Sequence, residues 1–453
     1  MSNKHIKPHF EGIHVWEDYS AELRTEFRQS IEEGLDLSAY EDLFTAVSRM
    51  PKSEERTRIA DVLYDLVLNA SLKEGYPYRE PSDLEGIRAL RKLHPLTGTL
   101  PAKDVLADKI YGAWLGRIVG CLLGKPVEGI RTNELIPLLR ASGNYPMHRY
   151  ILSSDITEEL CNTYKFKLRG RCYADTVSGM PVDDDTNYVV LAQKIVEKHG
   201  RDFTACHVAQ AWLWYQPKDA YCTAERVAFR NFVNGYRPPE SALYKNPYRE
   251  WVGAQIRGDY FGYINPGNPA LAAEMAFRDA SISHVKNGIY GELFIAAMIA
   301  AAAVTDRIKD LLLAGLGEIP ATSRLYEAVS ELLRDFESGV TEEDAFKKIH
   351  TRFDEHNGHD WCHTISNALI VSAALLYGKG DFGRSICMAV ETGFDTDCNG
   401  ATVGSILGMR NGSAAIGDKW VKPLEDRLHT TIFGVGTVSI RECAEKTMAH
   451  LPI

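Results

Sequence analysis

The sequence lacks a long apolar run, a cysteine framework and a secretory signal. Its most apolar stretch, Leu293 to Val304, is shorter than the ~20 residues that a membrane-spanning helix needs. The nine cysteines are scattered from Cys121 to Cys443 without a C-x-x-C pair, which favours a reducing compartment and excludes a zinc ribbon. The first twenty residues contain no apolar segment. We therefore expect a cytoplasmic protein with no membrane partner.

The chain also lacks a basic stretch. Its formal net charge is −10 and no long run of Lys and Arg occurs, which argues against nucleic acid as the main partner, because phosphate binding needs a basic footprint. The hydrophobic share of 45% and the charged share of 25% are those of an ordinary globular protein. At 453 residues the chain exceeds what one core usually organises, so we expect two units.

Two regions of the chain differ in composition and in hydrophobic pattern. Residues 1–100 are rich in charge, with helical periodicity in Glu22 to Glu33 and in Arg56 to Leu72, and with a break at Tyr76-Pro-Tyr-Arg-Glu-Pro81. Long Ala, Leu, Ile and Val segments follow in residues 101–453, where alternating apolar and polar runs are scarce. The pattern predicts an all-α fold: a main helical domain over 101–453 and an N-terminal helical segment over 1–100. Leu293 to Val304 is predicted to be a buried core helix.

Glycine recurs at every fourth residue in two segments. On a helix these glycines line one face, which lets another helix approach closely. Glycine costs ~1 kcal/mol in a helix interior relative to alanine, so such rows indicate tight backbone contact. The rows are Gly112, Gly116, Gly120 and Gly124 in the first segment, and Gly400, Gly404 and Gly408 in the second.

The first cluster of chemical interest is Pro181-Val-Asp-Asp-Asp-Thr-Asn187, directly before a helical run from Tyr188 to Lys198. Aspartates are favoured at a helix start, where they cap the backbone and complement the dipole. That explanation suffices for one or two acids. The third adjacent carboxylate repels its neighbours, so a nearby cation becomes the better account.

The second cluster is Gly393-Phe-Asp-Thr-Asp-Cys-Asn-Gly400, again before a helix with small residues on one face. Asp395-x-Asp397-x-Asn399 resembles the start of an EF-hand loop, but Ile406 stands where a bidentate Glu is required. Oxygen ligands of this kind suit hard cations such as Mg²⁺ or Mn²⁺. Capping explains either cluster alone, whereas the two clusters together indicate a shared metal site.

Three further residues are ambiguous when taken alone. Glu128, in Leu123-Gly-Lys-Pro-Val-Glu-Gly129, falls on a turn that ends the glycine-rich helix, where an exposed glutamate is the simple interpretation. His359 and His363 have a spacing that occurs in zinc sites, but the Glu of H-E-x-x-H is missing. Solvated or pocket-lining histidines are the preferred interpretation. His284 by itself would be an ordinary histidine with its hydrogen bonds satisfied.

Together these pieces resemble the ADP-ribosylglycohydrolase family, which includes the dinitrogenase reductase-activating glycohydrolases. The resemblance extends over roughly residues 105–415 and leaves residues 1–100 outside it. The combination is specific although each piece alone is weak. The matching motifs are D-K-I-x-G-A-x-x-G and L-G-K-P-V-E-G in 108–129, D-D-D-T in 183–186, S-H in 283–284 and G-F-D-T-D in 393–397.

The resemblance implies an orthogonal multi-helix bundle with two Mg²⁺ or Mn²⁺ ions. It also implies cleavage of an N- or O-glycosidic bond to ADP-ribose, carried by an ADP-ribosylated protein or small molecule. We expect Glu128 and Asp184 to be catalytic, and His284, Gly393 and Asn399 to contact the substrate. The expected metal ligands are Asp183, Asp184, Asp185, Asp395 and Asp397.

This chain departs from the family pattern at three positions. Asp183 replaces a threonine and adds an oxygen with a negative charge, Cys398 replaces a threonine after D-T-D, and Phe394 replaces a glycine. Two alternatives remain open at this point. Paired aspartate clusters also serve two-metal phosphoester hydrolases, and a non-catalytic ADP-ribose-binding module would share the fold. The leaving group and the oligomeric state do not follow from the sequence.

Overall fold

The computed structural model describes residues 14–164 and 166–452, and its architecture is helical throughout apart from one short hairpin. The expected all-α fold is confirmed. The α-helices are α1 (Leu23–Glu32), α2 (Glu41–Ser48), α3 (Glu54–Asn69), α4 (Leu84–Leu90), α5 (Lys103–Gly124), α6 (Thr132–Ala141), α7 (Glu158–Thr163), α8 (Asp184–His199), α9 (Ala205–Tyr215), α10 (Thr223–Val233), α11 (Glu240–Leu243), α12 (Asp259–Tyr263), α13 (Pro269–Ala280), α14 (Lys286–Ala302), α15 (Ile308–Leu316), α16 (Arg324–Glu337), α17 (Glu342–Arg352), α18 (Gly358–Cys362), α19 (Thr364–Tyr377), α20 (Phe382–Glu391), α21 (Thr396–Asn411), α22 (Asp418–Val421) and α23 (Ile440–Ala449).

Short 3₁₀ turns and one antiparallel hairpin complete the chain. The hairpin pairs Leu428 with Val438, and it is the part that the all-α expectation did not include. The 3₁₀ turns are η1 (Val15–Glu17), η2 (Tyr19–Ala21), η3 (Ser38–Tyr40), η4 (Lys125–Val127), η5 (Ser153–Asp155), η6 (Lys218–Ala220), η7 (Ser413–Ala415) and η8 (Lys422–Leu424), and the strands are β1 (Arg427–His429) and β2 (Thr437–Ser439).

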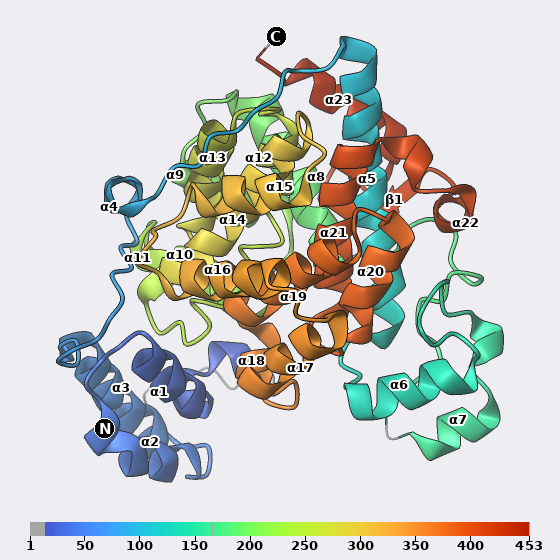
Figure 1. Ribbon diagram of the computed structural model, residues 1–453. Coiled ribbons are helices and arrows are strands. Elements are labelled where there is room, and N and C mark those ends of the chain that lie inside the picture. Colours follow the sequence, from blue (N-terminus) through green and yellow to red (C-terminus); the bar gives the residue numbers. More distant parts are fainter. Residues whose placement is uncertain (1–13, 165, 453) are drawn as a thin grey trace.

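The two glycine rows face each other. Helices α5 and α21 run antiparallel side by side (Figure 1), and a Cβ atom on Gly116 would lie 2.0 Å from the carbonyl oxygen of Gly404. The corresponding distance from Gly120 to the oxygen of Gly400 is 1.9 Å. The predicted close helix approach is therefore present, and each row is the partner of the other. This contact brings the end of α5 beside the start of α21.

Helix α14 forms the centre of the main core. Every residue from Asn287 to Ala302 is buried, and the helix packs against α12, α13 and α15. The predicted buried helix at Leu293 to Val304 is therefore correct, although α14 begins earlier and ends at Ala302. A helix that is apolar all around is stable only in such an interior position.

The N-terminal segment has a small apolar core of its own, separate from the main core. Leu23, Phe44 and Leu63 from α1, α2 and α3 are buried together there, and the three helices lie at one corner of the molecule, in blue in Figure 1. The two regions with helical periodicity correspond to α1 and α3. From the break at Tyr76-Pro-Tyr-Arg-Glu-Pro81 the chain continues through α4 along the main domain.

Buried ion pairs join this segment to the main domain. Arg249 donates to Glu26 at 2.8 Å and to Glu33 at 2.6 Å, all three side chains being at least nine-tenths buried. Arg324 lies 2.8 Å from Glu80. Removing one partner of a buried pair is costly because the other charge stays desolvated, so the segment and the main domain stabilise each other.

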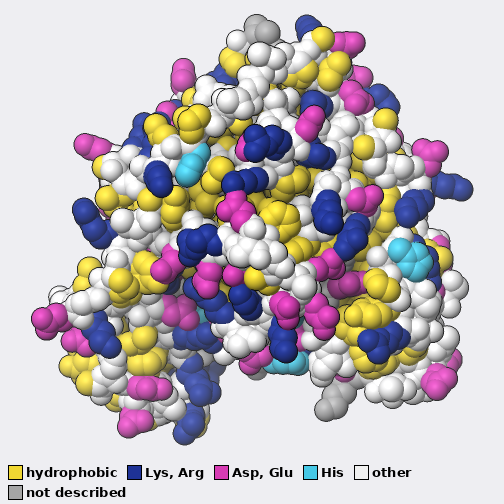
Figure 2. All heavy atoms as spheres, viewed as in Figure 1, with side chains coloured by type: hydrophobic (Ala, Val, Ile, Leu, Met, Phe, Trp, Pro, Cys, Tyr) yellow, Lys and Arg dark blue, Asp and Glu magenta, His cyan; other side chains and the backbone are white. Residues whose placement is uncertain are grey.

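Figure 2 shows acidic and basic side chains intermixed over much of the viewed face. No helix in the described part of the chain combines the length and the apolar character needed to cross a membrane.

Candidate metal centre

Three helix ends converge at the candidate site. The first aspartate cluster is at the start of α8, the second is at the start of α21, and the turn η4 with Glu128 follows the end of α5. The hydroxyl of Thr396 donates to the carbonyl oxygen of Gly124 at 3.0 Å, which ties the last turn of α5 to the first turn of α21. The structure thus brings the two predicted clusters and Glu128 together.

In the first cluster, the helix start fixes each aspartate differently. Asp183 is the N-cap of α8, and its side chain accepts from the backbone N–H of Asp185 at 2.9 Å. Its other oxygen lies 2.5 Å from Nζ of Lys125. Asp185 is fully buried, whereas Asp184 retains partial exposure. Capping therefore occupies only part of this cluster.

Arg117 binds Asp185 through both the side chain and the backbone of that aspartate. Its guanidinium donates to Oδ1 of Asp185 at 2.6 Å and to the backbone oxygen of the same residue at 2.8 Å. It also donates to Asp259 at 3.1 Å. Because one oxygen of Asp185 is engaged by Arg117, the other oxygen is the one directed toward the neighbouring aspartates and thiols.

In the second cluster, Asp395 is the N-cap of α21 and Asp397 lies in its first turn. Ligand atoms of Asp185, Asp397 and Cys398 all lie within 4.8 Å of one another. Asp397 is 3% exposed, and its Oδ1 has no hydrogen-bond partner among the described residues. A buried carboxylate oxygen without a donor is costly, so this atom is suited to receive a cation.

The carboxylates raise one another's pKa. Burial, together with the charges of Asp183 and Asp397, raises the pKa of Asp184 to about 7. The charge of Asp397, then burial and the charge of Asp183, raises the pKa of Glu128 well above its usual range. The pKa of Asp395 is raised in the same way by burial and by Asp397. Mutual repulsion of this kind is relieved by a positive ion.

Lys125 and Arg117 are the basic side chains that form ion pairs with these aspartates in the described part of the chain. The sequence motifs predict no role for either residue. A signal was present for Arg117, which is the only charged residue between Lys109 and Lys125 in the glycine-faced helix. A charge in such an interior has to be paired. No comparable signal in the sequence marks Lys125.

Two thiols border the aspartates. Sγ of Cys121 lies 4.0 Å from Oδ2 of Asp185, and Cys398 is the third member of the group around Asp397. Burial raises the pKa of both thiols far above its usual value, and the aspartate charges raise it further. Thiolates, not thiols, are the metal-ligating form, and a bound cation itself deprotonates a coordinating thiol, so Cys121 and Cys398 remain candidate ligands beside the carboxylates.

Gly393 and Asn399 have clear structural functions. Gly393 has φ +69°, and a Cβ atom there would lie 2.7 Å from Glu355 and 2.8 Å from the backbone nitrogen of Thr132. The side-chain amide of Asn399 donates to Asn367 at 2.8 Å, while its own oxygen is buried without a partner. Both residues lie beside the second aspartate cluster. Their contact with a substrate stays a prediction.

His284 lies in a buried cluster with Ser283 and Arg257. It is 1% exposed, and its Nδ1 is 2.8 Å from the hydroxyl of Ser283, which accepts from Arg257 at 3.0 Å. Burial and the nearby Arg257 lower the pKa of His284 well below its usual value. The same arginine pairs with Glu225 at 3.0 Å. The structure thus places His284 in this second buried ionic cluster, and its predicted role at the substrate stays a prediction.

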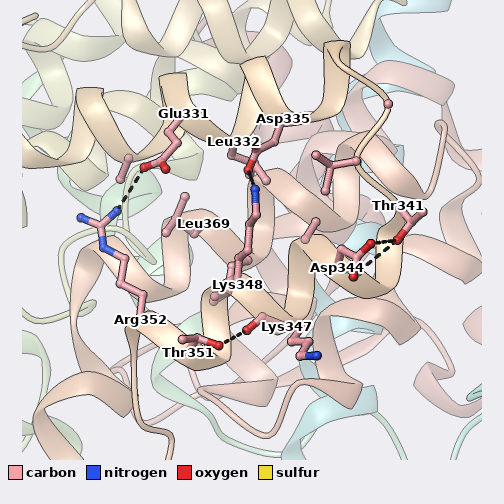
Figure 3. A pocket seen from close by; sticks show the side chains of 15 residues that line it. Glu331, Leu332, Asp335, Thr341, Asp344, Lys347, Lys348, Thr351, Arg352 and Leu369 are labelled. Carbon is pink, nitrogen blue, oxygen red and sulfur yellow. Dashed lines mark hydrogen bonds and ion pairs between the residues drawn. The ribbon is translucent and has the colours of Figure 1, made fainter.

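A cavity of about 720 Å³ lies elsewhere, between α16 and α17. Figure 3 shows it bordered by the ion pairs of Arg352 with Glu331 and of Lys348 with Asp335, at 3.8 and 2.8 Å. None of the predicted site residues lines it. We therefore do not assign the chemistry of this protein to that cavity.

The donor set of the aspartate site fits hard divalent cations. It offers carboxylate oxygens from two helix starts, and one of these oxygens lacks a donor among the described residues. Mg²⁺ and Mn²⁺ prefer oxygen ligands. Asp183, Asp185 and Asp397 therefore supply candidate ligand atoms for such ions, whereas the ligand roles of Asp184 and Asp395 stay predictions. Asp184 and Glu128 are the partly exposed carboxylates of the site.

Comparison with known proteins identifies the family of this chain. The sequence model of the ADP-ribosylglycohydrolase family matches residues 102–449. The chain belongs to the ADP-ribosylglycohydrolase family. Among solved structures, it is similar to one described as an ADP-ribosylglycohydrolase-related protein complex, with 17% identity, a TM-score of 0.47, and coverage of 77% of this chain and 98% of that chain. No curated protein matches the sequence. Family membership supports a glycohydrolase of ADP-ribose-related substrates.

Proposed function

We propose that this protein is a divalent-metal-dependent hydrolase that cleaves an N- or O-glycosidic bond to ADP-ribose or a related ribosyl compound. The observation that supports the proposal best is the convergence of Asp183, Asp185 and Asp397 at two helix starts, with an unpartnered buried oxygen on Asp397. A binding module would not need so many buried carboxylates that repel one another. A catalytic centre has a use for them.

Glu128 and Asp184 are our candidates for the catalytic groups. Of the six carboxylates at the centre, these two keep partial exposure, whereas the other four are buried. A group that takes a proton from water has to reach it within hydrogen-bond distance. Glu128 lies on the turn after α5, opposite the start of α8, so the two carboxylates flank the same approach to the centre.

Glycosidic cleavage passes through a transition state that resembles an oxocarbenium ion. Anionic side chains around the ribose stabilise the developing positive charge, and Asp184 and Glu128 are placed to do so. Two bound Mg²⁺ or Mn²⁺ ions would supply Lewis acidity and orientation at the ribose hydroxyls. Lys125, held 2.5 Å from Asp183, orients that carboxylate.

We also propose that residues 101–453 form the catalytic domain, because the family match begins at residue 102. Residues 1–100 are then an addition to the family domain. A cytoplasmic location stays a prediction.

The test is a hydrolysis panel. ADP-ribosylated arginine, ADP-ribosylated serine and ribonucleosides would be incubated with the protein in Mg²⁺, in Mn²⁺ and in excess chelator, and the released ribosyl product quantified by chromatography. We expect turnover of at least one member of the panel with metal and none after chelation. Asp395→Asn serves as the matched inactive variant, since it removes a charge without changing size. Full turnover by metal-free protein would overturn the proposal.

A further inference from the structure

The short helix α18 separates the N-terminal segment from the metal centre. We propose that the N-terminal segment holds α18, and through it the start of α21, in position, so that Arg28 and Glu32 are positioning residues for the second aspartate cluster. The inference rests on the proposed function, because it concerns the position of the proposed metal ligands. Its evidence is the contacts that α18 makes with α1 on one side and with the second aspartate cluster on the other. Residues 1–100 lie outside the family match, so nothing in that match assigns this role.

On the side of α18 that faces the N-terminal segment, two residues of α1 bind it. Arg28 forms an ion pair with Asp360, and Glu32 accepts a hydrogen bond from Nε2 of His359 at 3.0 Å. Asp360 and His359 are both buried, at 5% exposure each, while Arg28 and Glu32 are partly exposed. The contacts are charge-assisted, which makes them about twice as strong as neutral hydrogen bonds.

On the inner side, the next two residues of α18 contact the metal centre. The indole N–H of Trp361 donates to the carbonyl oxygen of Gly393 at 3.2 Å, and Sγ of Cys362 lies 4.0 Å from Oδ2 of Asp395. The backbone oxygen of Trp361 also accepts from Asn367, which in turn accepts from Asn399 in α21. A displacement of α18 would therefore move both the loop before α21 and its first turn.

Packing alone does not hold α18 on its outer side. A cavity of about 920 Å³ lies between α1 and the 356–359 stretch, and Phe27, Trp251 and His359 are among its lining residues. The main domain also contacts this five-residue helix, since Trp251 donates to His359 and Ser366 donates to the backbone oxygen of Asp360. The ion pair and the hydrogen bond from α1 add to these contacts on the side that faces the cavity.

The hydrogen bonds of His359 and His363 argue against a second metal site at this junction. Both imidazoles and Glu32 lie close enough to share an ion. However, Nδ1 of His359 accepts from the indole of Trp251 at 3.1 Å, and Nδ1 of His363 accepts from the backbone N–H of Ile365 at 3.1 Å. A neutral imidazole that accepts at Nδ1 carries its proton at Nε2, which is the atom a metal would need. The junction is therefore a set of contacts between the imidazoles of His359 and His363 and the carboxylate of Glu32.

The experiment compares full-length Glu32→Ala and Arg28→Ala with Asp61→Asn. The control removes another contact between the same segment and the main domain, the pair of Asp61 with Lys245 at 2.5 Å, but it does not touch α18. Mn²⁺ binding would be measured by calorimetry, and hydrogen exchange by mass spectrometry over residues 358–363 and 393–397. Glu32→Gln, whose amide oxygen still accepts from His359, should recover most of the wild-type behaviour.

We expect Glu32→Ala and Arg28→Ala to weaken Mn²⁺ binding about 10-fold, as loss of an outer support of metal ligands does, and to speed exchange in both stretches. Asp61→Asn should leave both quantities unchanged. Wild-type exchange in 393–397 in both alanine variants would overturn the inference, even where metal binding is intact and the proposed function stands. If the wild type binds no divalent ion, the proposed function fails, and the exchange comparison still decides the inference.

Discussion

Gly116 and Gly404 contact each other backbone to backbone, so that a Cβ atom on Gly404 would lie 2.1 Å from the carbonyl oxygen of Gly116. No rotation of a side chain relieves such a contact, because both partners are main-chain atoms of long helices. The separation of α5 from α21 therefore has to increase if either glycine gains a methyl group. The same two helices carry Glu128 and the second aspartate cluster at their adjoining ends.

Gly404→Ala is accordingly expected to lower the free energy of unfolding by about 3 kcal/mol, the upper end of the usual cost of overpacking, and to weaken metal binding. Gly358→Ala is the matched control, because its added methyl group meets no atom within 4 Å. Urea unfolding measures the first quantity and calorimetry with Mn²⁺ the second. Equal stability of the two variants would contradict the described helix contact.

Arg117→Met is expected to lower the free energy of unfolding by about 3–5 kcal/mol, since it leaves Asp185 and Asp259 buried without their shared partner. Arg169→Met removes an exposed ion pair with Glu158, and its effect should stay below about 1 kcal/mol. Chemical denaturation of the two variants in chelator gives the comparison. Similar values for both would show that Arg117 is dispensable for the core.

Glu128→Gln should lower kcat by about 10²–10⁴-fold with little change in substrate affinity, because an amide cannot take a proton from water. Glu158→Gln changes a glutamate whose side chain is 81% exposed and should keep wild-type kcat. Steady-state kinetics on the active member of the substrate panel, with a binding titration beside it, separate the two effects. Near-normal kcat in Glu128→Gln would shift the role of base to the aspartates.

The stability of the metal-free protein should fall as pH rises from about 4 to about 7. The pKa of Asp184 is raised to about 7 by burial and neighbouring aspartates, so the folded state retains a proton that the unfolded chain has already released, and folding loses free energy over this window. Mg²⁺ or Mn²⁺ takes the place of such protons. Melting temperatures at pH 5.5 and 8, each with and without metal, should show a larger stabilisation by metal at pH 8. A larger effect at pH 5.5 would contradict the ligand assignment.

The sequence predicted what depends on local spacing. Four-residue spacing of Gly112 to Gly124 predicted a face for close helix approach, and three adjacent aspartates from Asp183 predicted more than capping. Both conclusions concern one helix at a time. The pairing of one glycine row with the other depends on tertiary packing, so it could not be predicted from a local pattern.

Contacts between single side chains and segments far away in the chain could not be predicted from the sequence. The spacing of His359 and His363 suggested a shared helix face, but α18 ends at Cys362 and His363 caps α19, so the spacing had no helical meaning. The partner of His359 is Glu32, more than three hundred positions earlier. Likewise, the pairing of Lys125 with Asp183 depends on how α5 meets α8.

The antiparallel glycine contact also limits how this protein can change in length. One extra residue within α5 would rotate everything beyond it by about 100°, and a side chain such as Leu115 or Arg117 would then be turned toward α21 in place of a glycine. The turn with Glu128 would be displaced from the aspartates at the same time. Insertions and deletions can therefore occur in the connecting loops. Within α5 or α21, a change of even one residue would break the alignment of the two glycine rows.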